Sequence, residues 1–131
     1  MTRLTLALAL LMLVLTSATS ALAKLPRPYP GTPRPPKNVG VAILHVFGKW
    51  RYRQAQCVAW YENRYVWRGR GAISPTSDYG LFQVNRPSWE STFDFRQMLH
   101  LYYNTRAAYR ISRGGRDWSP WSVVTIQGHC R

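Results

Sequence analysis

The stretch Ala55–Tyr65, "AQCVAWYENRY", decides the fold class and supplies the first candidate site. At helical spacing, Glu62 shares one stripe with small and apolar residues: Ala55, Val58, Ala59, Tyr65 and Val66. A carboxylate therefore stands where the pattern asks for an apolar side chain. Most helical glutamates are solvated surface residues. On this stripe, however, lost hydration is expected to raise the pKa of Glu62 and to keep the acid protonated as a proton donor.

The N-terminal residues have the pattern of an export signal. Arg3 precedes an apolar run from Leu4 to Leu15, and the small-residue triplet Ala21-Leu22-Ala23 follows. We interpret residues 1–23 as a secretory signal peptide cleaved before Lys24, because the apolar run is too short to span a bilayer comfortably. The sequence then predicts a soluble mature protein without a transmembrane segment, secreted or associated with the cell wall.

The segment after the signal, "KLPRPYPGTPRPP", has a proline at nearly every second or third position. Such a composition favours an extended, polyproline-like spacer, although a proline-motif ligand is an alternative. We therefore expect a Pro-rich tether over residues 24–37, with no packed structure, and a folded domain over residues 38–131.

The chain is strongly basic, with 18 Lys and Arg residues against five Asp and Glu and a formal net charge of +13. Such a chain is attracted to polyanions. An exported protein without a base-reading motif is not expected to bind nucleic acid specifically, so anionic cell-wall polymers or an anionic membrane surface fit better. Solubility by itself explains only part of this charge.

Two cysteines, Cys57 and Cys130, are present. In an oxidising compartment they should pair, closing a loop of about 70 residues that contributes roughly 4 kcal/mol by the chain-entropy relation. A metal site is not expected from two cysteines so far apart, even with His129 beside one of them. No residue cluster calls for a metal or an organic cofactor.

The remaining pattern predicts several short helices around one hairpin, which is an α+β, mainly helical class. Helices are expected from Asn38 to Gly48, from Tyr52 to Tyr65, from Phe93 to Tyr102, from Asn104 to Ile111 with Gly114 and Gly115 as the stop, and from Ser119-Pro120 to Gln127. The strand-like part runs from Tyr79 to Val84 among turn residues. Trp50 and Trp60 are expected to pack, and Glu90 to be exposed.

Three motifs in register carry a family resemblance: "CVAWYENRY", "SDYGLFQVN" and "GGRDWSPW". Together they resemble the lysozyme superfamily, which includes animal-type lysozymes and the soluble lytic transglycosylase and goose-type branch. The resemblance covers most of residues 38–131 and implies a lysozyme-like fold whose small β-hairpin forms one side of a saccharide cleft. The short domain with a single cysteine pair favours the bacterial branch.

The resemblance also implies roles for individual residues. Glu62 matches the general acid, and Asp78 matches the nucleophile or electrostatic partner of animal-type lysozymes. The matched positions that border the saccharide are Gln83, Asn85 and Trp118, with Tyr79, Trp89 and Trp67 as weaker candidates, whereas Trp121 resembles a core residue. Cys57 and Cys130 match a family disulfide.

For several of these positions, a purely structural role is the alternative. Asp78 lies in a turn rich in Ser, Thr and Pro and could equally accept local hydrogen bonds. Gln83 and Asn85 could satisfy the hairpin backbone, and Trp118 could be a core residue. Arg64 departs from the family pattern, and if it folded back towards Glu62 it would favour ionisation and weaken the proton donor.

The resemblance implies a secreted, monomeric glycosidase that cleaves the β-1,4 bond between N-acetylmuramic acid and N-acetylglucosamine in peptidoglycan. It could be a muramidase or a lytic transglycosylase, with Glu62 as general acid, and anionic wall polymers would be further partners. One alternative is a non-catalytic, cationic cell-wall-binding module with the same fold. Another is a cationic, membrane-active protein, which the six tryptophans and the many arginines would suit.

Overall fold

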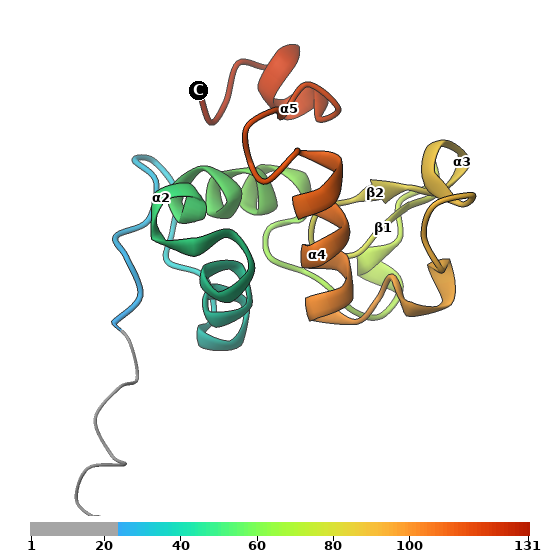
Figure 1. Cartoon of the computed structure of the whole chain (residues 1–131), viewed down its shortest axis with the longest axis horizontal. Helices are drawn as coiled ribbons and strands as arrows, with labels where there is room; N and C mark the ends of the chain where they lie inside the picture. Colours follow the sequence, from blue (N-terminus) through green and yellow to red (C-terminus); the bar gives the residue numbers. More distant parts are fainter. Residues whose placement is uncertain (1–23) are drawn as a thin grey trace, which may run out of the picture.

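The computed structural model describes residues 24–131, and the predicted signal peptide, residues 1–23, lies outside the described residues. The elements are α2 (Lys37–Asn63), η2 (Arg70–Ala72), β1 (Asp78–Tyr79), β2 (Val84–Asn85), α3 (Arg86–Trp89), η3 (Phe95–Gln97), α4 (Leu101–Ile111) and α5 (Ser122–Thr125) (Figure 1). Helices dominate, and a two-stranded antiparallel sheet accompanies them. The α+β prediction is therefore confirmed. Among the described residues, no helix has the length and apolarity needed to cross a membrane.

Helix α2 consists of two helical parts separated at Gly48, whose φ of 71° is left-handed. The predicted helix stop at this glycine is therefore confirmed. The predicted cap at Asn38 is wrong, because Pro36 occupies the N-cap position and Asn38 lies inside the first turn. At the other end, Arg64 adopts a left-handed conformation and its backbone N–H donates to the Trp60 carbonyl, which ends the helix two residues earlier than predicted.

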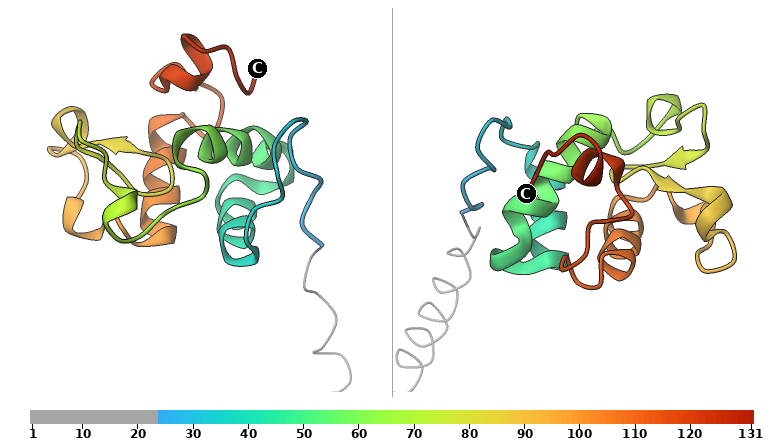
Figure 2. Two further views of the ribbon diagram at one scale, coloured as in Figure 1. Left: turned by 180° about the vertical axis from the view of Figure 1, so that it is seen from behind. Right: turned by 90° about the horizontal axis from the view of Figure 1, so that it is seen from above.

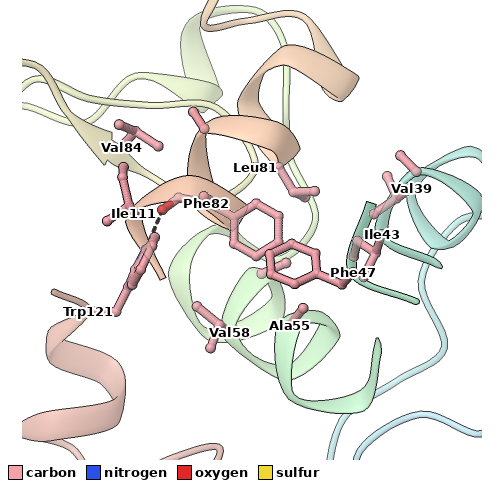
Figure 3. Close-up of a cluster of buried hydrophobic side chains, with 14 of the residues drawn as sticks. Val39, Ile43, Phe47, Ala55, Val58, Leu81, Phe82, Val84, Ile111 and Trp121 are labelled. Carbon is pink, nitrogen blue, oxygen red and sulfur yellow. Dashed lines mark hydrogen bonds between the residues drawn. The ribbon is translucent and has the colours of Figure 1, made fainter. Parts of the chain in front are cut away.

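The hydrophobic core forms where α2 packs against α4 and against the loop between the two strands. Figure 3 shows this cluster, with Phe47 of α2 beside Phe82 and with Leu81 close by. The Phe47 ring also stacks on Trp118, with centroids 5.5 Å apart. Burial of each large apolar side chain stabilises the fold by about 1.5–3 kcal/mol, so this cluster fixes the position of α2.

A hairpin is present, but the single strand predicted from Tyr79 to Val84 is wrong, because residues 80–83 form the turn between strands that pair Asp78 with Asn85 and Tyr79 with Val84. Between the strands the chain turns, and Leu81 and Phe82 are fully buried in the core. Gly80 has a φ of 74°, and a Cβ there would lie 2.4 Å from the Asn104 amide nitrogen. Glycine is therefore required at this point by both conformation and space.

The middle of the chain corrects two helix predictions. Asn104 is not a cap but a fully buried residue inside α4, where its side chain accepts from Phe82 N and donates to the Tyr79 carbonyl. The helix predicted from Phe93 to Tyr102 is wrong, since that stretch contains only η3 and the start of α4. Here the Asp94 backbone N–H donates to the Tyr103 hydroxyl of α4, and this contact takes the place of a helical hydrogen bond.

The C-terminal helix is also shorter than predicted, since α5 begins at Ser122 with Trp121 at its N-cap. Ser119 therefore caps no helix, and its backbone N–H donates to Asp117 instead. The Trp121 indole donates to the Phe82 carbonyl at 2.8 Å, drawn as a dashed line in Figure 3. This hydrogen bond anchors the start of α5 to the loop between the strands.

The Pro-rich segment has no helix or strand, but the expectation that it does not pack is wrong. Figures 1 and 2 show residues 24–36 running alongside α2. The backbone N–H of Tyr29 donates to the fully buried Gln56 side chain at 2.8 Å, and the Tyr65 hydroxyl donates to the Pro33 carbonyl at 2.7 Å. Leu25 packs against the core as well. The segment also turns at residues 30–32, where the Thr32 backbone N–H donates to the Tyr29 carbonyl. These contacts could not be predicted from composition.

The predicted disulfide between Cys57 and Cys130 is confirmed, with the two Cα atoms 5.6 Å apart. It joins α2 to the segment that follows α5. The right-hand view of Figure 2 shows that α5 lies over α2, which places the start of α5 near the C-terminal end of that helix. The expectation that Trp50 packs is wrong, because its side chain is 97% exposed.

Candidate active site

A pocket of about 380 Å³ lies between the end of α2, the hairpin and the start of α5. Its walls come from the end of α2, the hairpin with α3, the end of α4 and the start of α5. They are lined by Glu62, Asp78, Gln83, Val84, Asn85, Ser88, Trp89, Ile111, Pro120, Trp121 and Ser122. The two carboxylates singled out from the sequence therefore line the same pocket.

Glu62 stands on the last turn of α2 and is partly buried. Burial raises its pKa to about 7, and the negative charge of Asp78 adds to that rise. Within residues 24–131, no hydrogen bond or salt bridge to the Glu62 carboxyl group forms, so nothing offsets the lost hydration. A carboxylic acid in this environment keeps its proton near neutral pH and can donate it to a ligand in the pocket.

Arg64, the departure from the family pattern, does not turn towards Glu62. Its guanidinium carbon lies 4.5 Å from the Trp60 ring centroid, in a cation–π contact. Neighbouring Asn63 donates its side-chain amide to the Val66 and Gly71 carbonyls and so holds the loop that follows α2. The residues after Glu62 thus shape the helix end and leave the acid unpaired among the described residues.

Asp78 has a different environment, because three side chains donate to its carboxylate. The Ser74 and Thr76 hydroxyls donate to Oδ2 at 2.6 and 2.5 Å, and the Asn85 amide donates to Oδ1 at 2.8 Å. The turn rich in Ser and Thr, together with Asn85, therefore fixes the position of the Asp78 carboxylate at the pocket wall.

Gln83 and Asn85 both line the pocket but do not share a strand face. Gln83 lies in the turn with a φ of 49°, and its amide donates to the Ala72 and Gly80 carbonyls. Asn85 bonds Asp78 with its amide nitrogen, while its oxygen accepts from the Ser88 backbone and hydroxyl at the start of α3. Both residues thus hold the hairpin together as well as facing the pocket.

Trp118 was expected to border the saccharide, but it stacks on the core rings of Phe47 and Phe82 and does not line the pocket. Trp121 lies in the core, as expected, and also forms part of the pocket wall. Tyr79 faces a different hollow, where its ring meets Phe95 edge-on. Of the weaker candidates, Trp89 lines the pocket and Trp67 does not.

Sequence reasoning missed several wall residues, among them Ser88, Ile111 and Ser122. Each lies at or next to a helix end, where helical periodicity does not indicate which way a side chain points. For Asp78, the sequence does indicate the hydrogen bonds to its carboxylate, because hydroxyl residues stand four and two positions before it. That spacing lets both hydroxyls reach one carboxylate in a tight turn.

The arrangement brings together a protonated acid and a fixed carboxylate in an open, partly apolar pocket. Such a pair can protonate a leaving oxygen on one side and oppose positive charge on the other. A family model described as a lysozyme-like domain matches residues 55–123, which is more than half of the chain. The chain therefore belongs to the lysozyme-like domain family, which at the general level is a family of the peptidoglycan-acting glycosidase or transglycosylase type. No curated protein and no solved structure matches the chain.

Proposed function

We propose that this protein is exported and cleaves the β-1,4 bond between N-acetylmuramic acid and N-acetylglucosamine, with Glu62 as the general acid. One observation carries this proposal: the pKa of Glu62 is raised to about 7 in a pocket that Asp78 also lines. The family match and the confirmed disulfide support it. The strongly positive charge would hold the enzyme on the anionic wall and should do so less well in high salt.

In the proposed step, the Glu62 proton passes to the glycosidic oxygen. The bond from that oxygen to C1 of the muramic acid breaks, and its electron pair stays with the leaving N-acetylglucosamine. Positive charge then develops at C1, and Asp78 opposes it electrostatically. An incoming hydroxyl group bonds to C1 and returns its proton to the Glu62 carboxylate.

Asp78 is assigned an electrostatic role because three donors already occupy its oxygens. A carboxylate held in this way is a weaker nucleophile, since attack on C1 would sacrifice those hydrogen bonds. The incoming hydroxyl then belongs either to water or to C6 of the muramic acid itself. Water gives a reducing end, and the 6-hydroxyl gives an anhydro end.

The test is digestion of purified peptidoglycan by the mature chain and by Glu62→Gln, with mass spectrometry of the released muropeptides. We expect muramyl ends from the wild type and almost none from the variant, which should still sediment with peptidoglycan. Equal turnover by both proteins would overturn the assignment of Glu62. Binding without turnover by either protein would establish the non-catalytic wall-binding alternative.

A membrane-active function is favoured by one observation, the fully exposed Trp50 between Lys49 and Arg51. Tryptophan and cations at a surface suit the interface of an anionic bilayer. Leakage of dye from anionic lipid vesicles, lost in Trp50→Ala and retained in Glu62→Gln, would support this second function. Intact vesicles at concentrations that degrade peptidoglycan would exclude it.

A further inference from the structure

A second hollow, of about 310 Å³, adjoins the Glu62 pocket. Trp89, Ile111 and Pro120 line both hollows, so the two lie next to each other on the surface. Its far side is lined by Arg110 and Arg113, which also line a third hollow beyond it together with Arg116. We refer to the surface around these three arginines as the arginine groove.

The arginine groove is positively charged, and its cations are only partly neutralised, by Asp117, whose pKa is lowered by hydrogen bonding to Ser119 and also by the charge of Arg113. Within residues 24–131, salt bridges form at Arg86–Glu90 and Arg96–Asp94, and neither involves the groove. Asp117 is the one carboxylate among the groove's lining residues, and it accepts the Ser119 backbone N–H. Three guanidinium groups thus face one carboxylate, which leaves donors available to an anionic ligand.

The groove is also ordered before any ligand arrives. The Arg110 guanidinium carbon lies 5.0 Å from the Phe93 ring centroid, a contact that orients the planar group and leaves its edge available. Arg113 and Arg116 stand in a turn closed by backbone hydrogen bonds to Arg110 and Ser112. Cations at the end of α4 also suit the helix dipole, but that effect concerns stability and not ligand choice.

Resting on the proposed function, we propose that the arginine groove binds the carboxylates of the stem peptide carried by the muramic acid of the substrate. That peptide is attached through the lactyl group at O3, on the same sugar whose glycosidic bond Glu62 would cleave. The lining residues that the two hollows share place the groove next to the pocket in which that sugar would bind. Guanidinium groups bind carboxylates through paired, charge-assisted hydrogen bonds, so the groove would select peptide-bearing glycan over bare glycan.

The test measures binding, so that it does not depend on turnover. Glu62→Gln is titrated with glycan fragments that carry free stem carboxylates, with the same fragments after amidation of those carboxylates, and with peptide-free glycan. We expect amidation or peptide removal to weaken binding about tenfold, and Arg110→Gln with Arg113→Gln to remove that difference. Each of the two changes is also made singly, and Arg106→Gln, which removes one charge one turn earlier on α4, is the control for the single variants and should keep the difference.

The outcomes distinguish failure of the carboxylate site from failure of the enzymatic function. Equal binding of all three ligands, or an equal effect of Arg106→Gln, overturns the carboxylate site whether or not the wild type is active. Carboxylate-dependent binding without turnover by the wild type retains the site and overturns the enzymatic function. Stronger binding of isolated teichoic acid than of the peptide-bearing fragments, lost in the same double variant, would assign the groove to phosphate and also overturn the proposal.

Discussion

The helical region and the hairpin region hold their carboxylates by opposite means. Apolar burial at the end of α2 keeps Glu62 without a hydrogen-bond partner among the described residues and raises its pKa to about 7. The hairpin surrounds Asp78 with the Ser74, Thr76 and Asn85 donors. Two acids that line one pocket are therefore held in different surroundings: Glu62 is desolvated, and Asp78 is fixed by hydrogen bonds.

The strongest test of this comparison is the pair of isosteric variants. Glu62→Gln removes the proton donor and should lower turnover of peptidoglycan roughly 10³-fold, within the range for a general acid. Asp78→Asn should lower it only about tenfold, because a solvated charge interaction is worth on the order of 1 kcal/mol. Initial rates on purified peptidoglycan measure both. Equal losses would show that Asp78 takes part in the chemistry as fully as Glu62.

Removal of the disulfide should affect the helical region most. With Cys57 and Cys130 both changed to serine, a loop closed over a sequence separation of 73 opens in the unfolded chain. We expect a loss of about 4 kcal/mol in the free energy of unfolding, measured in urea. The control is wild-type protein reduced under the same conditions, which should lose a similar amount. An unchanged urea midpoint would contradict the prediction.

The raised pKa of Glu62 makes stability depend on pH. Its pKa is about 7 in the folded protein and near the ordinary value of 4.5 in the unfolded chain. The folded state therefore holds the proton more tightly, and this contribution, up to about 3 kcal/mol, is present below pH 4.5 and lost as pH rises through 7. Compared with Glu62→Gln, the wild type should lose stability between pH 4 and pH 8.

Thermal unfolding of both proteins across that range measures the effect, because all other titrating groups are common to the pair. A constant difference in melting temperature from pH 4 to pH 8 would contradict the raised pKa. The same titration should appear in catalysis. The alkaline limb of kcat/KM is expected near pH 7 and should move to lower pH in Asp78→Asn, which removes the smaller cause of the shift.

Asn104 connects the two regions, since its side chain bonds the Phe82 N–H and the Tyr79 carbonyl. Asn104→Ala should leave both backbone groups without a protein partner and cost about 2 kcal/mol in the free energy of unfolding. Amide exchange should quicken in the hairpin more than in α2. Asn38→Ala, at an exposed position, is the control and should change stability by less than about 0.5 kcal/mol. Uniform exchange throughout the chain would contradict a connecting role.

Local pattern was sufficient where the signal lies within a few residues of the feature it predicts. The helical class, the stop at Gly48 and the hairpin around Tyr79 were all predicted and are confirmed. The apolar stripe around Glu62 likewise predicted a raised pKa, because burial on a helix face follows from periodicity. The pairing of Cys57 with Cys130 spans 73 residues and was predicted from the count of two cysteines and not from local pattern. Cap predictions did worse: Asn38 lies inside the first turn of α2, Asn104 is buried in α4, and the Ser119 backbone N–H donates to Asp117.

The sequence by itself determined that an acid lies on a helical face with apolar neighbours, that a hydroxyl-rich turn precedes a second acid, and that residues 24–36 form no helix or strand. Only the tertiary structure decided that Trp121 and not Trp118 lines the pocket, that Arg64 stacks on Trp60, and that the Pro-rich segment packs through Gln56. The physical reason is the distance along the chain over which each kind of interaction acts. Propensity and periodicity act within a turn or two, whereas these contacts join residues whose approach is fixed by the packing of the whole core.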